Sequence, residues 1–213
     1  MPHHVFISYA HLDNKPDDVQ GWVANFHSRL EMYLSEYLGT PAQIWRDRKR
    51  MREANFLTPT IEDNLRESLT LISIISPSYV NSEWCRKELE NFCRQVGIEA
   101  GNFSRAIYVK KLPVPDLQLP SVFSDSSGFD FFEEGQDGYP FALSPTSAAF
   151  DANIKKLAFQ IKEILSALQK PQKAIYLAET TSDLREQRDK IRQDLIQRKF
   201  KVLPSPLIAK PLD

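Results

Sequence analysis

The amino-acid sequence predicts an α/β fold, a flavodoxin-like doubly wound parallel sheet of five strands with helices on both faces, plus a C-terminal βαβ-like extension. Short apolar runs alternate with amphipathic stretches along the chain, the order that crossover connections between parallel strands produce. Residues 71–76 form a nearly continuous apolar run, as expected of a central strand covered on both faces. With 213 residues, of which 42% are hydrophobic and 26% charged, the chain can bury such a core.

The first strand and helix follow the amino terminus directly. Residues 5–9 (VFISY) are the first strand. Apolar side chains then recur at three- and four-residue steps from Trp22 to Tyr37, which predicts a helix. Residues 39–41 end this helix, and residues 43–45 (QIW) form a second, short strand.

A charged loop and a second helix lead to the central strand. The loop covers residues 47–53. In the helix after it, Thr58 can act as the N-cap and Pro59 suits the first helical position. The apolar face of this helix carries Ile61, Leu65 and Leu69.

The remaining elements complete the predicted sheet. Pro77 ends the central strand, and residues 81–82 precede a helix with apolar side chains. Residues 106–109 (AIYV) form a fourth strand, and residues 129–132 (FDFF) form a fifth strand at the edge. The apolar face of a closing amphipathic helix carries Phe150, Ile154, Leu157, Ile161, Ile164, Leu165 and Leu168. Each of the five strands is thus expected to be followed by a helix.

The pattern predicts two units. Residues 1–170 form a complete α/β domain, and residues 170–173 (KPQK) are a linker. A strand at residues 174–178, a helix and a strand at residues 200–203 then repeat the order seen at the amino terminus. Residues 171–213 therefore resemble the start of a second α/β unit, a truncated sensor or partner module. A lone βαβ unit cannot bury its apolar face, so it must pack on the first domain, another chain or further residues.

Charge and glycine content exclude several function classes. The formal charge of −1, from 27 basic and 28 acidic residues, does not indicate binding to nucleic acid or a membrane surface. None of the seven glycines occurs at the close, fixed spacing of G-x-G-x-x-G or G-x-x-x-x-G-K-[ST]. We therefore expect no bound cofactor, no Rossmann cofactor cradle and no P-loop.

Cysteine and histidine patterns and hydropathy narrow the classes further. Four histidines and two cysteines form neither H-E-x-x-H nor C-x-x-C, so no metal site is expected. Cys85 and Cys93 are eight residues apart on one predicted helix, roughly 12 Å, which is too far for a disulfide. No apolar run approaches the ~20 residues of a membrane span, and no signal-peptide pattern precedes the first strand. We expect a cytoplasmic protein with free thiols.

Polar segments follow three of the strands, at the edge where open parallel sheets bind ligands. They are residues 8–11 (SYAH), 45–48 (WRDR) and 76–79 (SPSY). The start of the next helix, residues 81–89 (NSEWCRKEL), adds a fourth segment. We expect the side chains of these segments to meet in one cleft.

The same segments resemble a bacterial Toll/interleukin receptor (TIR) domain. FISYAH, W-x-D, SPSYVNSEWCRKELE and FDFF carry the resemblance, which extends over residues 3–168. Its most specific motif is S-P-x-Y-x-x-S-x-W-C-x-x-E-L. Many, though not all, TIR domains cleave the bond between nicotinamide and ribose in NAD⁺. The resemblance implies an NAD⁺ glycohydrolase or cyclase, activated by self-assembly in antiphage defence signalling, with NAD⁺ as substrate and not cofactor.

The resemblance also implies roles for single residues. Glu88 matches the essential glutamate of the W-C-x-x-E motif, and its chemistry is that of a glycosidase carboxylate beside an oxocarbenium-like ribose. Trp84, one helical turn earlier, can place its indole against the pyridinium, where cation–π attraction contributes roughly 0.5–2 kcal/mol. The substrate-binding residues are then Tyr9, Ala10, His11, Trp45, Asp47, Arg48, Trp84 and Lys87.

The loop at residues 47–56 corresponds to the loop through which TIR enzymes self-associate and complete their sites from two protomers. Most of its central residues are basic and suit a pyrophosphate or an acidic face on a neighbour. The self-association residues are Arg48, Lys49, Arg50, Met51 and Arg52. A homo-oligomer is therefore expected.

Other interpretations of these residues remain open. The fold and the basic loop equally suit a non-enzymatic scaffold for homotypic protein–protein interaction. Trp84 and Trp45 can be core residues, Asp47 a turn residue and His11 a surface residue. A phosphoacceptor receiver domain is not supported, because residues 9–11 (YAH) stand where its paired acids belong.

Overall fold

The computed structural model describes residues 2–15, 20–47, 59–124, 126, 128–169, 174–198 and 200–203. The chain divides into two compact units, Met1–Ala167 and Leu168–Asp213. The predicted linker at residues 170–173 and the predicted cap Thr58 lie outside the described residues.

The first unit is built on the predicted five-stranded parallel sheet, whose strand order is β2-β1-β3-β6-β7. Its strands are β1 (His3–Tyr9), β2 (Ile44–Arg46), β3 (Ser68–Ile75), β6 (Ala106–Lys110) and β7 (Phe129–Asp130). β1 and β3 are paired over most of their length, with Phe6 opposite Leu71 and Ser8 opposite Ser73. The doubly wound fold class predicted from the sequence is confirmed.

Helices α2 (Pro59–Arg66), α3 (Pro77–Val80) and α4 (Glu83–Gln95) cover one face of the sheet. Side chains that alternate along β1 and β3 meet them there, because every second residue of a strand points to the same face. Two serine caps begin these helices: Ser76 Oγ accepts from the Tyr79 N–H at 3.0 Å, and Ser82 Oγ from the Cys85 N–H at 3.3 Å. The core of this layer includes Phe6, Leu71, Ile75, Ile61, Leu65, Leu89 and Phe92.

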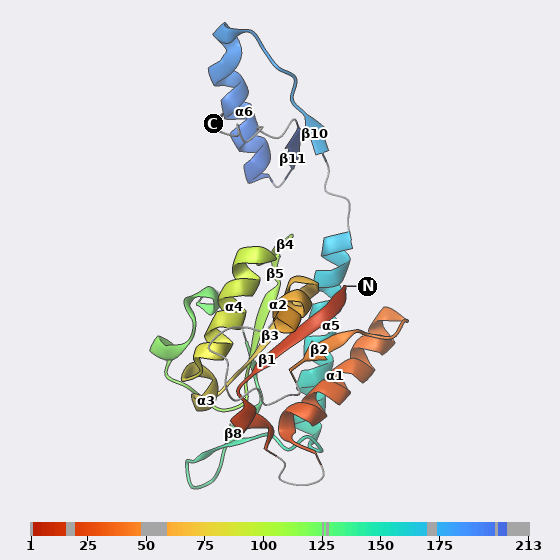
Figure 1. The fold of residues 1–213 in the computed structure, drawn as a ribbon, viewed down its shortest axis with the longest axis vertical. Coiled ribbons are helices and arrows are strands. Elements are labelled where there is room, and N and C mark those ends of the chain that lie inside the picture. The colour runs from red at the N-terminus through yellow and green to blue at the C-terminus, as the bar shows by residue number, and fades with distance from the viewer. Residues whose placement is uncertain are drawn as a thin grey trace. The chain divides into compact units, whose positions relative to one another are not determined.

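Helices α1 (Trp22–Leu38) and α5 (Ala148–Gln169) cover the opposite face, and in Figure 1 they lie on the other side of the sheet from α4. Aromatic rings hold this layer together, with centroid distances of 5.4 Å for Trp22–Phe26, 5.5 Å for Phe26–Phe131 and 5.2 Å for Phe131–Phe150. Gly39 ends α1 in the left-handed conformation, at the predicted position.

Three details differ from the sequence-based expectations. Leu69 belongs to β3 and not to the preceding helix, because α2 ends at Arg66 and Ser68 already pairs with His3. The segment after β6 forms two 3-10 turns, η2 (Asp116–Gln118) and η3 (Ser121–Phe123), and no α-helix; prolines at positions 113, 115 and 120 interrupt helical hydrogen bonding there.

The third difference concerns the edge strand. The FDFF segment is divided, so that Phe129 and Asp130 form β7 while Phe132 begins a hairpin of β8 (Phe132–Glu134) and β9 (Pro140–Ala142). A second small hairpin pairs β4 (Glu99–Ala100) with β5 (Phe103–Ser104), and the 3-10 turn η1 (His11–Asn14) follows β1.

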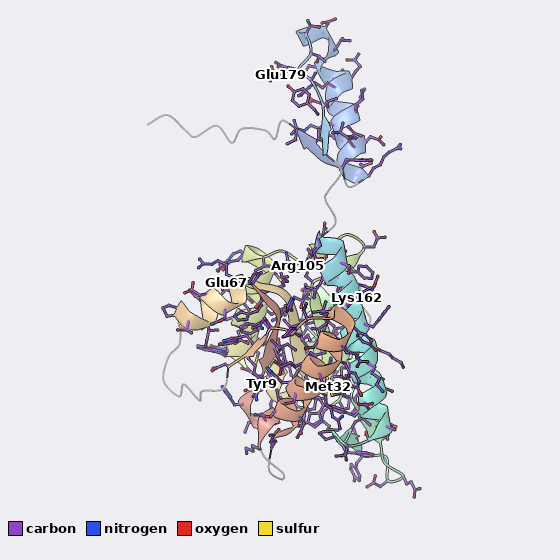
Figure 2. All side chains as sticks on the ribbon, turned by 90° about the vertical axis from the view of Figure 1, so that its right-hand side faces the viewer. Tyr9, Met32, Glu67, Arg105, Lys162 and Glu179 are labelled. Atoms are coloured by element: carbon purple, nitrogen blue, oxygen red, sulfur yellow. The ribbon has the colours of Figure 1, made fainter. Side chains whose placement is uncertain are left out.

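The second unit contains β10 (Ala174–Tyr176), the 3-10 turn η4 (Ser182–Leu184), α6 (Arg185–Gln197) and β11 (Lys201–Leu203). The two strands are parallel, with Ile175 opposite Val202, as the predicted βαβ extension requires. Glu179, labelled in Figure 2, belongs to this unit. Across the part of the chain that the structure describes, no helix has the length and apolarity needed to cross a membrane.

Candidate functional site

A cavity of about 550 Å³ opens beyond the carboxyl ends of the strands. This is the edge at which open parallel sheets bind ligands, since every parallel strand ends there. Figure 2 labels Tyr9, the last residue of β1. The cavity is lined by Tyr9, Ala10, His11, Leu12, Asp47, Pro77, Ser78, Asn81, Ser82, Trp84 and Cys85. Residues from the ends of three strands and the start of one helix therefore line one cavity.

Glu88 lies directly behind this lining, on α4. Its side chain is 3% exposed and does not itself line the cavity. Two donors hold its carboxyl group: Ser8 Oγ donates to Oε2 at 2.5 Å, and Trp84 Nε1 donates to Oε1 at 3.1 Å. Burial raises the pKa of Glu88 to about 8, although both hydrogen bonds favour the charged form.

Local geometry explains how this cluster forms. Trp84 and Glu88 are four residues apart on α4, so their side chains lie on the same helical face. Ser8 shares a strand face with the core residue Phe6, because side chains two apart on β1 point the same way. Ser8 therefore points toward the layer that contains α4.

A second cluster forms the opposite wall of the cavity. The Tyr9 hydroxyl donates to the main-chain carbonyl of Asp47, and the Tyr9 and His11 rings meet edge-on with centroids 5.5 Å apart. His11 Nε2 lies 3.9 Å from Asp47 Oδ2. Burial raises the pKa of Tyr9, so its phenol is neutral near pH 7. Three of the predicted substrate-binding residues thus contact one another.

Arg46 contacts this cluster from outside the cavity lining, and the sequence-based site omitted it. Its Nη1 donates to the Tyr9 hydroxyl at 3.5 Å. Its buried Nε has no hydrogen-bond partner among the described residues, which leaves donor capacity for an anion. The signal in the sequence was a single charged residue at the end of the short strand Ile44–Arg46.

Two predicted substrate-binding residues, Trp45 and Lys87, lie outside the cavity lining. Trp45 stacks on Phe6 at 4.9 Å and packs against the core, and neither Trp45 nor Lys87 lines the cavity. The predicted self-association residues lie outside the described residues, and one of them, Arg48, was also predicted to bind substrate: Arg48, Lys49, Arg50, Met51 and Arg52.

A largely buried ion pair joins Asp13 to Lys111 at the carboxyl ends of the strands. Asp13 accepts from Ser76 Oγ at 2.6 Å and from Lys111 Nζ at 3.2 Å, and the same ammonium donates to the Asp13 carbonyl at 2.9 Å. These three residues follow β1, β3 and β6, so the pair ties the ends of three strands together. No periodic pattern in the sequence predicts this contact.

Few of the described side chains near the cavity can act as metal ligands, nucleophiles or acid–base groups. The described residues contain no group of three or more His, Cys, Asp or Glu side chains that could hold a metal ion. Cys85 is a free thiol whose pKa burial raises to about 12, so it carries no thiolate near neutral pH. Glu88 is the buried acid closest to the cavity wall formed by Trp84.

Comparisons with known proteins found a matching family model and several similar solved structures. A family model described as "TIR domain" matches residues 5–142. The TIR domain of the Toll-related receptor TRR-2 from Hydra magnipapillata is a similar structure, with a TM-score of 0.39 and 17% identity over 61% of this chain and 84% of that chain. The TIR domains of the activated Roq1 resistosome, which recognises the pathogen effector XopQ, match with a TM-score of 0.32 and 16% identity over 90% of this chain and 98% of that one. No curated protein matches the sequence.

Proposed function

The chain belongs to the TIR domain family, and from this premise we propose that it cleaves the nicotinamide–ribose bond of NAD⁺, with Glu88 as the catalytic carboxylate. The observation that carries the proposal is the Glu88 carboxyl group, buried and held by two donors directly behind the cavity lining. Many members of the family are NAD⁺ nucleosidases, and Glu88 occupies the matching motif position.

The reaction needs only one carboxylate. The bond between ribose C1′ and the ring nitrogen breaks with its electron pair going to nicotinamide, which leaves as a neutral molecule without a proton. Ribose becomes oxocarbenium-like, and an ionised carboxylate near its hydroxyls stabilises that charge. Water then adds to C1′ and loses a proton to give ADP-ribose, or an adenine nitrogen adds to give a cyclic isomer.

The protonation of Glu88 couples binding to catalysis. With a pKa of about 8, the carboxyl group is mostly protonated at pH 7 in the empty site. A bound pyridinium cation favours the ionised form and lowers this pKa. Trp84, at the cavity wall, offers its ring face to the same cation. Substrate binding thus generates the carboxylate that the reaction uses.

The diphosphate of NAD⁺ needs a cationic partner near the cavity. The Arg46 guanidinium contacts the cavity-lining Tyr9, and its Nε has no hydrogen-bond partner among the described residues, so it is a described cation next to the cavity. Arg48 and the other basic residues of the 47–56 loop supply further positive charge and, by family analogy, the contact between protomers. Self-assembly through this loop would then activate the enzyme.

The test is nicotinamide release by the full chain at high protein concentration, with and without a crowding agent. Wild type should release nicotinamide, and Glu88→Gln, which keeps the side-chain shape, should not. Glu90→Gln is the matched control, because Glu90 is on the same helix and forms only an exposed pair with Arg86. If wild type is inactive in every condition that drives assembly, or equals Glu88→Gln, the proposal is wrong.

A non-enzymatic scaffold for homotypic association is the second candidate function. The observation that favours it is that Glu88 does not line the cavity in this structure. This function predicts that charge reversal at Arg48 and Arg50 abolishes self-association, while no nucleotide is ever consumed. Analytical ultracentrifugation, combined with the nicotinamide assay, separates the two candidates.

Residues 171–213 would serve as a sensor or partner module that controls assembly, in defence signalling by NAD⁺ depletion or by a cyclic product. The parallel pairing of β10 with β11 supports an α/β module. Its removal should alter the concentration at which the first unit assembles, without changing the nicotinamide-releasing site.

A further inference from the structure

We propose that Ser8 is the positioning residue of the site, whose hydroxyl anchors Glu88 Oε2 on the sheet side and supports ionisation of the carboxyl group. Oε1, on the side of Trp84, is then free to exchange the indole donor for a substrate hydroxyl. This assignment rests on the proposed function of Glu88 and adds a residue to which neither the sequence nor the family match gives a role.

The geometry separates the two oxygens of the carboxyl group. Ser8 is 1% exposed and donates to Oε2 from β1, beneath α4, whereas Trp84 donates to Oε1 and lines the cavity. Because Ser8 and Glu88 are both buried, water cannot replace the serine donor when it is removed. The contact with Ser8 is therefore internal, and the contact with Trp84 is the one that a ligand in the cavity can reach.

The groups around Glu88 disfavour its ionised form, so the hydrogen bond from Ser8 affects the charge of the carboxyl group. Burial raises the pKa of Glu88 most, and the charge of Asp47, which follows β2, adds a smaller rise. Tyr9 of β1, Tyr79 of α3 and Cys85 of α4 are also near Glu88, and each has a raised pKa and is neutral at pH 7. Ser8 and Trp84 are the two donors that oppose these effects.

Ser73 provides a matched comparison that separates positioning from packing. It is directly opposite Ser8 in the sheet, it is fully buried, and it points to the same layer. Its hydroxyl accepts from the Tyr79 hydroxyl at 2.8 Å and does not contact Glu88. Ser73→Ala therefore removes a buried hydroxyl from the same face of the sheet and keeps both donors of the Glu88 carboxyl group, Ser8 and Trp84.

The experiment is a pH titration of the Glu88 carboxyl ¹³C signal by NMR, in the full chain and without substrate. Glu88→Gln assigns the signal. Loss of a hydrogen bond to a charged acceptor should raise the apparent pKa by about one unit or more in Ser8→Ala. Ser73→Ala should leave it unchanged. If Ser8→Ala does not fold, Ser8→Cys, of similar volume and with a weak donor, should give the same upward shift.

The same variants are then compared in nicotinamide release across pH. The acidic limb of kcat/KM should move upward with Ser8→Ala and stay in place with Ser73→Ala. The assignment is overturned if the Glu88 titration is the same in wild type and Ser8→Ala, or if Ser73→Ala shifts it equally. A chain that shows the predicted titration shift but never releases nicotinamide would instead contradict the proposed function, so the two failures are distinguishable.

Discussion

Replacing Trp84 by phenylalanine tests how the site controls the charge of Glu88. The substitution keeps an aromatic ring at the cavity wall and removes the Nε1 donor that lies 3.1 Å from Glu88 Oε1. A hydrogen bond to a charged group contributes about 1.5–3 kcal/mol. Since 1.36 kcal/mol corresponds to one pKa unit, the pKa of Glu88 should rise by about one to two units.

The consequence for activity depends on pH. Wild-type Glu88, with a pKa of about 8, is ionised in about a tenth of molecules at pH 7. A further rise should lower kcat/KM at pH 7 by about 10- to 100-fold, whereas the two enzymes should converge at alkaline pH. The assay is the initial rate of nicotinamide release between pH 6 and pH 10.

A matched control separates this effect from loss of an indole in general. Trp22 is buried, and its Nε1 donates at 2.9 Å to the Leu143 carbonyl on the opposite face of the sheet. Trp22→Phe should therefore lower stability without moving the pH profile. A uniform loss of activity at every pH in Trp84→Phe, or the same shift in Trp22→Phe, would show that the Trp84 hydrogen bond does not control the charge of Glu88.

Three more perturbations test Glu88, Arg46 and the Asp13–Lys111 pair. Because the pKa of Glu88 in the folded state is raised above 4.5, the native state binds more protons than the unfolded state between pH 4.5 and pH 8. The free energy of unfolding should therefore fall as pH rises through this range. Glu88→Gln should flatten this slope, as measured by urea titrations. Arg46→Gln should raise KM for NAD⁺ about tenfold with little change in kcat, in steady-state kinetics, if the guanidinium binds diphosphate. Lys111→Met should lower the free energy of unfolding by about 3–5 kcal/mol, because it leaves Asp13 buried without its cation. The control is Lys110→Met, which loses only a 4.0 Å pair with an exposed carboxylate. It should lower the free energy of unfolding by less than about 1 kcal/mol in the same denaturation series.

The strands of the parallel sheet could be predicted from the sequence because hydrophobic periodicity marks them. Residues 71–75 are apolar nearly throughout and form most of β3, the strand paired on both sides. The predictions that were wrong concern segments in which a helical pattern competes with another local structure. Leu69 fits the helical pattern, but pairing with β1 extends the strand to Ser68. Prolines after β6 prevent the helix that the alternating order suggested.

The site could be predicted only where it depends on spacing along one element. Trp84 and Glu88 are four residues apart, so their contact follows from helical geometry. Ser8 lies eighty residues from Glu88, and its contact depends on which face of β1 packs under α4. Lys111 and Asp13 are separated by ninety-eight residues and meet only because their strands end at the same edge. Contacts of this kind leave no periodic signal in a sequence.

We propose that this TIR domain breaks the nicotinamide–ribose bond of NAD⁺ with the Glu88 carboxylate. The most direct measurement follows the nicotinamide proton resonances of NAD⁺ by NMR, in the presence of the assembled full chain, because it detects cleavage whichever product forms. We expect free nicotinamide to accumulate with wild type and with Glu90→Gln, faster at pH 8.5 than at pH 6.5, and not with Glu88→Gln. Unchanged NAD⁺ with assembled wild type, or equal cleavage by Glu88→Gln, would contradict the claim.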